Sequence, residues 1–264
     1  ESDLKKAIDA GGAVTLGDDI TVTTTLSVTK DLEVNLNNHT LTGAGSVILV
    51  QGAKLVVNGP GTIKEKNPDY GAIAVKGSNK AEDMNYTTVE VNKDVVLEAW
   101  APIFVTPYQS SGAPYAYGVT ITVNGATLNA KKDSGAAGGT GVYVNGQITH
   151  TENAPVINLT DTTIYDSDNA SEGMYLAGYA RTTLTGCTIT GTTGVEIRAG
   201  ELTVNGGSIT GTATPIGEAP NGNGSTVTGA GIAVSQHTTM LPLTVTVNGS
   251  NVKGYSAFYQ VDTL

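Results

Sequence analysis

A ten-residue pattern of apolar and polar positions recurs along the whole chain. In residues 202–211 it reads LTVNGGSITG, which is an alternating strand that ends at Asn-Gly and is followed by a second short strand. Copies begin at Val34, Leu55, Val89, Ile121, Ile157, Thr182, Leu202 and Val245. The starts at 34 and 55 are 21 residues apart and those at 182 and 202 are 20 apart, so the unit has about twenty residues plus insertions. Such a period is typical of a solenoid.

A third short strand, usually opened by glycine, precedes each copy of the pattern. These strands end at Val50, Val75, Val105, Val144, Leu176, Ile197 and Val234. Each unit therefore contains three short strands, and we expect every strand to pair in parallel with its equivalent one turn away. The pattern predicts a single all-β domain over residues 13–264, with about nine or ten coils.

The asparagine that ends the second strand predicts a column of stacked side chains. Neighbouring members would lie about 4.8 Å apart, and each amide could bond the corner of the next turn. Two threonines, Thr160 and Thr185, interrupt this column midway. The expected members are Asn37, Asn58, Asn92, Asn124, Asn205 and Asn248.

The two ends of the chain differ in character. Residues 1–12 predict a capping helix with Ser2 as N-cap and one apolar face that includes Leu4 and Ile8. Such a helix would cover the open end of the first coil. Residues 255–264 are apolar and β-like with no helix to cover the last coil, so we expect the natural protein to continue or a neighbour to mask this end.

These features resemble the right-handed parallel β-helix of the pectin-lyase-like superfamily, in which an asparagine ladder follows the second strand of each coil. The resemblance covers essentially the whole chain and implies an all-β solenoid. Many members are polysaccharide lyases or hydrolases that act on the outer face of the first strand, whereas others are phage tailspikes or surface adhesins. A fold does not carry its function with it, so the activity stays open.

Composition and charge narrow the class of protein. The net charge of −10 and the presence of only two arginines argue against nucleic acid or an anionic membrane as partner. No apolar run is long enough for a membrane span. The single cysteine, Cys187, excludes an intrachain disulfide and is interpreted as a packed structural thiol. A bacterial secreted or cell-surface location is expected.

Alternation predicts which side chains of the glycine-led strand point outward. With Val142 and Val144 inside, the outward column contains Ala74, Phe104, Tyr143, Tyr175, Glu196 and Ala233. The three aromatic rings would form a ridge that packs against the apolar faces of sugar rings, or would only stiffen the sheet. Glu196 and Arg198 share this face, and together with Phe104, Tyr143 and Tyr175 they are the predicted ligand-binding residues.

Long insertions predict walls for a groove above this ridge. Loops 76–88, 106–118 and 145–155 follow the first strand on consecutive coils, and loops 129–139, 165–171 and 210–229 lie opposite. Trp100, Tyr108, Tyr115 and Tyr117 sit in or beside the second insertion, where they could lean over the groove or fill their own loop.

Catalytic and metal-binding signals are sparse. Glu196 and Arg198 are weak catalytic candidates, and the favoured interpretation is a surface ion pair, because a glycosidase needs two converging carboxylates. The alternating oxygens of Asp166, Asp168 and Glu172 could hold calcium, although such turns are usually just solvated. No cofactor is required.

The sequence therefore favours a secreted or cell-surface bacterial module with a glycan-binding or adhesion role, without catalysis, and with a polysaccharide or surface glycan as partner. Further domains of the same chain are expected. The alternative is a polysaccharide lyase or glycoside hydrolase that uses the first-strand groove. A second alternative is a structural spacer or phage-type fibre.

Overall fold

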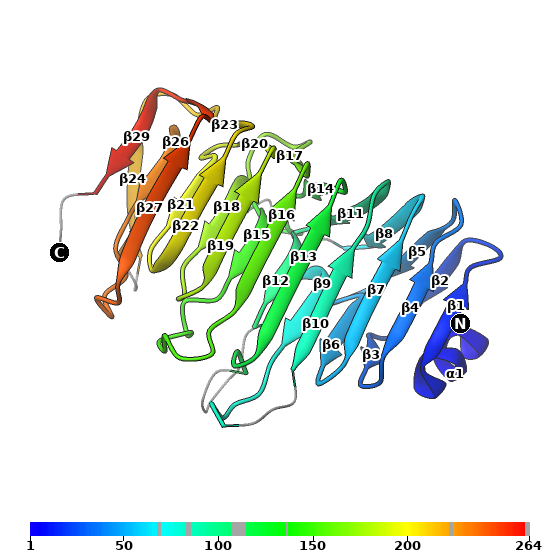
Figure 1. The fold of residues 1–264 in the computed structure, drawn as a ribbon. Coiled ribbons are helices and arrows are strands. Elements are labelled where there is room, and N and C mark those ends of the chain that lie inside the picture. The colour runs from blue at the N-terminus through cyan, green and yellow to red at the C-terminus, as the bar shows by residue number, and fades with distance from the viewer. Residues whose placement is uncertain (68–69, 83–85, 107–114, 136, 222–223, 262–264) are drawn as a thin grey trace.

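The computed structural model describes residues 1–67, 70–82, 86–106, 115–135, 137–221 and 224–261. The chain forms a right-handed parallel β-helix in which each turn contributes one strand to each of three nine-stranded parallel sheets (Figure 1). The predicted three strands per coil and all-β class are confirmed. We call the sheets A, B and C in the order in which the chain enters them.

Sheet A holds the strands that precede the Asn corner. In spatial order they are β1 (Gly12–Thr15), β4 (Leu32–Asn35), β7 (Lys54–Asn58), β10 (Thr87–Val91), β13 (Val119–Asn124), β16 (Val156–Thr160), β19 (Arg181–Thr185), β22 (Gly200–Asn205) and β27 (Leu243–Asn248). Sheet B follows that corner. Its strands are β2 (Ile20–Val22), β5 (Thr40–Gly43), β8 (Gly61–Glu65), β11 (Val95–Ala99), β14 (Thr127–Ala130), β17 (Thr163–Asp166), β20 (Thr188–Gly191), β23 (Ser208–Gly211) and β28 (Asn251–Lys253).

Sheet C contains the glycine-led strands and carries the predicted site. Its members are β3 (Leu26–Val28), β6 (Ile48–Gln51), β9 (Gly71–Lys76), β12 (Ala101–Val105), β15 (Thr140–Val144), β18 (Glu172–Leu176), β21 (Val195–Ile197), β26 (Ala230–Val234) and β29 (Ser256–Gln260). One antiparallel hairpin, β24 (Gly217–Asn221) with β25 (Gly224–Thr228), stands apart from the three sheets.

The hydrophobic core is a set of columns along the helix axis. Inward residues of sheet A pair in register from coil to coil, as in Leu55 with Val89, Val89 with Ile121 and Ile121 with Ile157. All four side chains are buried in one continuous cluster. Because each apolar side chain packs on its equivalent in the next turn, the period-two pattern of each strand stabilises the whole solenoid.

Gly141 and Gly173 stand near the start of β15 and β18, where the packing against sheet B leaves no room for a side chain. A Cβ at Gly141 or Gly173 would lie 2.2 or 2.5 Å from the Cγ2 atom of Ile164 or Ile189 on sheet B. Gly173 and the buried Met174 therefore both face the interior. Simple alternation breaks at this point, and the residue before the glycine, Glu172, lies on the outer face.

The asparagine ladder is present, with one correction to its first member. Asn58 donates its Nδ2–H to Asn35 Oδ1 at 2.9 Å, and Asn92 donates to Asn58 at 2.8 Å. The predicted member Asn37 is wrong, since it lies two residues later in a turn with φ of 51° and donates to Leu16 O instead. The first copy of the repeat is therefore LEVN of β4, which pairs residue for residue with β7.

The bonds of the ladder also differ from the expected ones, because amide bonds amide rather than the backbone of the next corner. Asn248 donates to Asn205 at 2.9 Å in the last coils. Thr160 and Thr185 occupy the position between, in register with Asn124 and Asn205, as predicted. Cys187 is buried beside this column and donates its S–H to Leu159 O at 3.3 Å, as a structural thiol does.

The capping helix α1 (Ser2–Ala10) covers the first coil (Figure 1). Leu4 and Ile8 are buried and join the main core cluster. Ser2 is not the N-cap, which is Glu1. The Glu1 carboxylate accepts hydrogen bonds from Lys5 Nζ and from Thr23 Oγ1, so it fastens the start of the helix to the first coil.

Candidate functional site

The predicted outward column runs in register across sheet C. Phe104 pairs with Ala74 on one side and with Tyr143 on the other, and Tyr143 pairs with Tyr175. The column continues from Tyr175 to Glu196 and then to Ala233. The geometry expected from alternation is therefore confirmed for these positions.

The column does not form one long open groove. Ala74, Glu196 and Ala233 are fully buried, and Phe104 is only 7% exposed. At the C-terminal end the hairpin β24–β25 lies over the outer face of sheet C, where Val227 packs with Ala230 and Ala233 in a second small cluster. The predicted groove is therefore shortened to a cleft over β12, β15 and β18.

The interpretation of Glu196 and Arg198 as a surface ion pair is wrong, because both side chains are 0% exposed. Arg198 Nε donates to Glu196 Oε1 at 2.6 Å, and Glu196 Oε2 accepts the Val227 N–H at 2.7 Å. The guanidinium also donates to Asn221 Oδ1 at 2.9 Å and Thr226 Oγ1 at 3.0 Å. The pair is thus a buried anchor for the hairpin.

Burial raises the pKa of the Glu196 carboxyl, and the Arg198 guanidinium together with the Val227 N–H opposes that rise. Both oxygens of Glu196 are engaged by protein donors. Glu196 and Arg198 are therefore inaccessible to a ligand in this arrangement, although each was a weak catalytic candidate.

Four aromatic side chains form the floor and one wall of the cleft. The ring of Phe104 lies 4.9 Å from that of Tyr143, and Tyr143 lies 5.4 Å from Tyr175, centroid to centroid. Trp100 packs on this ridge at 5.5 Å from Tyr143, held by its Nε1–H bond of 3.1 Å to Gly138 O. Trp100 therefore leans over the floor.

The other aromatic residues expected near the second insertion do not join this cluster. Tyr117 stacks on His150 at 3.6 Å between ring centroids, with an interplanar angle of 14°. Tyr115 lies against Lys76, whose Nζ is 5.6 Å from the ring centroid. Both thus join the second insertion to the neighbouring insertions, and Tyr108 lies outside the described residues.

The two predicted walls stand on opposite sides of sheet C. On one side the insertions contact one another, since Ser78 pairs with Tyr117 and Gly118 N–H donates to Asn153 O. In Figure 1 the described parts of these connections lie along the edge where sheet A begins. On the other side, Gly139 N–H donates to Ser171 Oγ at 2.8 Å. The stacking of loops from consecutive coils is therefore as expected in the described parts.

Two hollows open on either side of the aromatic ridge. The first has a volume of about 390 Å³ and is lined by Trp100, Phe104, Tyr143, Asn145, Gly146, Gln147, Tyr175 and Ala177. The second has a volume of about 270 Å³ and is lined by Trp100, Gly138, Gly139, Thr140, Tyr143, Glu172, Tyr175 and Thr226. Trp100, Tyr143 and Tyr175 belong to both, so the hollows form one cleft divided by a ridge.

Glu172 borders the second hollow, a position that the sequence did not reveal. Its Oε2 atom is buried and has no hydrogen-bond partner among the described residues. Burial, together with the negative charge of Glu196, holds the pKa of this carboxyl well above its ordinary value, against the opposing effect of Arg198. Burial also raises the pKa values of Tyr143 and Tyr175. The recurring glycine at 173 was the available signal, because it reverses the alternation before it.

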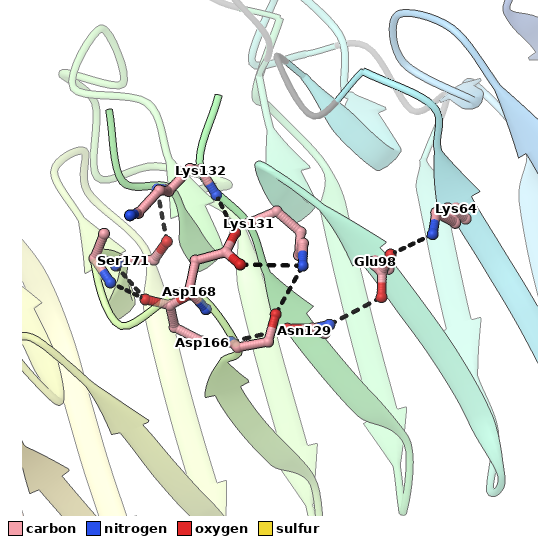
Figure 2. A network of polar contacts seen from close by, with 11 residues as sticks. Lys64, Glu98, Asn129, Lys131, Lys132, Asp166, Asp168 and Ser171 are labelled. Carbon is pink, nitrogen blue, oxygen red and sulfur yellow. Dashed lines mark hydrogen bonds and ion pairs between the residues drawn. The ribbon is translucent and has the colours of Figure 1, made fainter. Parts of the chain in front are cut away.

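The predicted calcium ligands do not come together. The Asp166 carboxylate accepts the N–H groups of Asp168, Ala170 and Ser171, and Asp168 accepts the Lys132 N–H at 3.0 Å (Figure 2). Glu172 faces the cleft instead. Within the described ranges, no three His, Cys, Asp or Glu side chains are placed to share a metal ion.

The carboxylates of this turn join loops of consecutive coils. Lys131 Nζ donates to Ser167 Oγ at 2.8 Å and to Asp168 at 3.3 Å (Figure 2). The hydrogen bond from the Lys132 N–H is the main reason that the pKa of Asp168 lies below its usual range. These oxygens are engaged by protein donors, and calcium binding stays a prediction.

Comparison of the sequence and the structure with known proteins identified no relative of this chain. No protein-family model, no curated protein and no solved structure matches the chain. Among the described residues, no helix is long and apolar enough to cross a membrane.

Proposed function

We propose that this β-helix is a glycan-binding module of a secreted or cell-surface protein, and that it belongs with the pectin-lyase-like β-helices. The aromatic cleft over β12, β15 and β18 carries the proposal. Both hollows are lined by Trp100, Tyr143 and Tyr175. Aromatic rings at a concave site are suited to packing against the apolar face of a ligand. A sugar ring presents such a face through its C–H groups.

Polar groups in the cleft support a saccharide over a purely apolar ligand. Asn145 and Gln147 line the first hollow, and Thr140 and Glu172 line the second. Asn145 is held by Thr106 O and the Gln147 N–H, whereas Glu172 Oε2 has no partner among the described residues and can accept from a sugar hydroxyl. A structural spacer or fibre would need neither the hollows nor this mixture of side chains.

The alternative, a polysaccharide lyase or hydrolase, has weaker support. Hydrolysis of a glycosidic bond ordinarily needs two carboxyl groups at the scissile bond. Among the described residues that line the cleft, Glu172 alone carries a carboxyl group, and Glu196 is sealed beneath the hairpin. The cleft therefore favours binding without catalysis.

A glycan array with matched tyrosine variants tests the proposal. We expect the wild type to retain at least one saccharide, and Tyr143→Ala to weaken that binding by about tenfold, since it removes one of the three rings shared by both hollows. Tyr143→Phe keeps the ring and should bind as the wild type does. Tyr165→Ala is the control, because Tyr165 is 37% exposed on sheet B, away from the cleft.

Loss of binding in Tyr165→Ala, or full binding in Tyr143→Ala, would contradict the proposal, as would an array on which no saccharide is retained. Incubation with uronate-rich and neutral polysaccharides separates the enzyme alternative. Turnover, read from unsaturated product or new reducing ends and abolished by Glu172→Gln, would favour that alternative.

A further inference from the structure

The Glu172 carboxyl is a buried polar group at the edge of the cleft. It lies at the start of β18 and faces the hollow between Trp100 and Tyr143, with Oε2 buried and without a partner among the described residues. A buried carboxyl oxygen with no donor costs free energy in the folded state. A ligand that brought a donor to this atom would remove that cost.

Two neighbouring donors, Thr140 and Trp100, are already engaged elsewhere. The Thr140 hydroxyl donates to Val142 O at 3.1 Å, and Trp100 Nε1–H donates to Gly138 O at 3.1 Å. The Thr226 hydroxyl oxygen accepts from Arg198 and from Asn221, and its own O–H is directed elsewhere than to Glu172 Oε2. None of these described groups donates to Glu172 Oε2.

The charges around the hollow leave Glu172 uncompensated. Arg198 is the nearby cation, and it is paired with Glu196 at 2.6 Å under the hairpin. With that pair neutral, ionised Glu172 would be a single negative charge at the edge of an aromatic pocket. A positively charged ligand group would neutralise it and would favour the ionised form of the carboxyl.

The aromatic rings are also suited to a cation. The guanidinium of Arg198 lies 4.9 Å from the centroid of the Tyr175 ring, so one aromatic side chain of the cleft already holds a positive group. On the open side, Trp100 and Tyr143 lie 5.5 Å apart and border the same hollow as Glu172. An ammonium there would meet ring faces and a carboxylate together.

We propose that the ligand of this cleft is a saccharide with a free amino group, whose ammonium is bound by Glu172 against Trp100 and Tyr143. This inference rests on the proposed glycan-binding function and specifies the class of glycan. The remaining sugar units lie along the ridge toward Asn145 and Gln147 in the larger hollow.

Calorimetric titration with two matched oligosaccharides tests the inference. A glucosamine tetrasaccharide carries ammonium groups, whereas the N-acetylglucosamine tetrasaccharide has the same backbone with neutral amides. We expect the glucosamine oligomer to bind at least about tenfold more tightly, which is the size of one charge-assisted hydrogen bond. Equal affinity for the two, or no binding of the glucosamine oligomer, would overturn the inference.

Protein variants assign the preference to Glu172. Glu172→Gln keeps the shape and removes the charge, so it should bring the affinity for the glucosamine oligomer down to that for the acetylated one. Glu90→Gln is the control, because Glu90 pairs with Lys54 on the surface of sheet A. An unchanged preference in Glu172→Gln overturns the assignment, and the comparison of ligands on the wild type does not depend on how any variant folds.

The two proposals fail in different ways. If both oligomers bind equally and Tyr143→Ala weakens both, the cleft is a glycan site and the amino-sugar inference is wrong. If no saccharide binds at all, the proposed function is itself wrong.

Discussion

At the scale of single residues, two glutamates on one face of sheet C have opposite environments. Glu196 is enclosed and satisfied by Arg198 and the Val227 N–H. Glu172, on the preceding coil, has an unpartnered buried oxygen and borders the cleft. The same side chain thus anchors the hairpin at one position and borders the cleft at the other, because the hairpin covers only the first.

Glu172→Gln should change how stability depends on pH. The pKa of Glu172 in the folded protein lies well above its ordinary value of 4.5, so the carboxyl binds its proton more tightly when folded. Its contribution to the free energy of unfolding therefore falls as pH rises from about the unfolded pKa through the folded pKa. The variant lacks this loss, so its free energy of unfolding should fall less than that of the wild type between pH 4 and pH 8.

Urea unfolding at the two pH values measures this difference, with Glu90→Gln as the control. The explanation is wrong if Glu172→Gln and the wild type show the same change in stability between pH 4 and pH 8.

At the scale of elements, the hairpin β24–β25 decides the extent of the site. It is antiparallel in an otherwise parallel molecule, and it is joined to sheet C by buried polar contacts. Thr193 Oγ1 donates to Val227 O, and Ser235 Oγ donates to Ser225 O. These contacts fix the end of the cleft at Thr226.

Removal of Arg198 should destabilise the protein far more than removal of the other arginine. Arg198→Ala leaves Glu196 as an unpaired buried carboxyl, so we expect a loss of about 3 kcal/mol in the free energy of unfolding. Arg181→Ala is the matched control, since its pair with Glu201 is 43% and 51% exposed and should contribute less than about 1 kcal/mol.

Denaturant unfolding of both variants measures this, and limited proteolysis should show faster cleavage within 217–228 for Arg198→Ala. Adding Glu196→Ala to Arg198→Ala should recover part of the loss, because no buried charge then remains. Equal losses for Arg198→Ala and Arg181→Ala would rule out this role for the ion pair.

At the scale of the whole molecule, each coil is stabilised mainly by packing against the coils before and after it along the axis. Each coil contacts mainly its neighbours through register-matched columns, so an end coil has one uncovered side. Helix α1 covers that side at the N-terminal end, where Leu4 and Ile8 join the core (Figure 1). At the last coil, Tyr255 and Phe258 are exposed.

Detaching helix α1 should destabilise the first coils and expose the edge strands of the three sheets. The double substitution Leu4→Asp and Ile8→Asp places charges in the buried face of α1, and should lower the free energy of unfolding by at least about 3 kcal/mol. The freed edges of β1, β2 and β3 should then promote association between molecules.

Thermal unfolding and sedimentation measure the two effects. Lys6→Asp is the control, because its side chain is 78% exposed on the opposite face of the helix. A double variant that is as stable and as monodisperse as Lys6→Asp would show that α1 is not a cap.

Much of the fold follows from the sequence alone. Three strands per coil, the broken asparagine ladder, the cap and the outward positions of Phe104, Tyr143 and Tyr175 are all local consequences of period-two alternation repeated about every twenty residues. The start of the repeat was set two residues late in the first copy because Asn35 and Asn37 fit the same alternation.

The limits of the site depended on tertiary structure. The sequence marks 210–229 as an insertion, but only folding shows that it returns over Glu196 and Arg198 and turns a groove into a cleft. Likewise Glu172 joins Trp100 and Tyr143 because Gly173 packs inward against Ile189, a contact between different sheets. Alternation determines which side of a strand a residue occupies, whereas exposure depends on what distant segments cover, and that is decided by packing across coils.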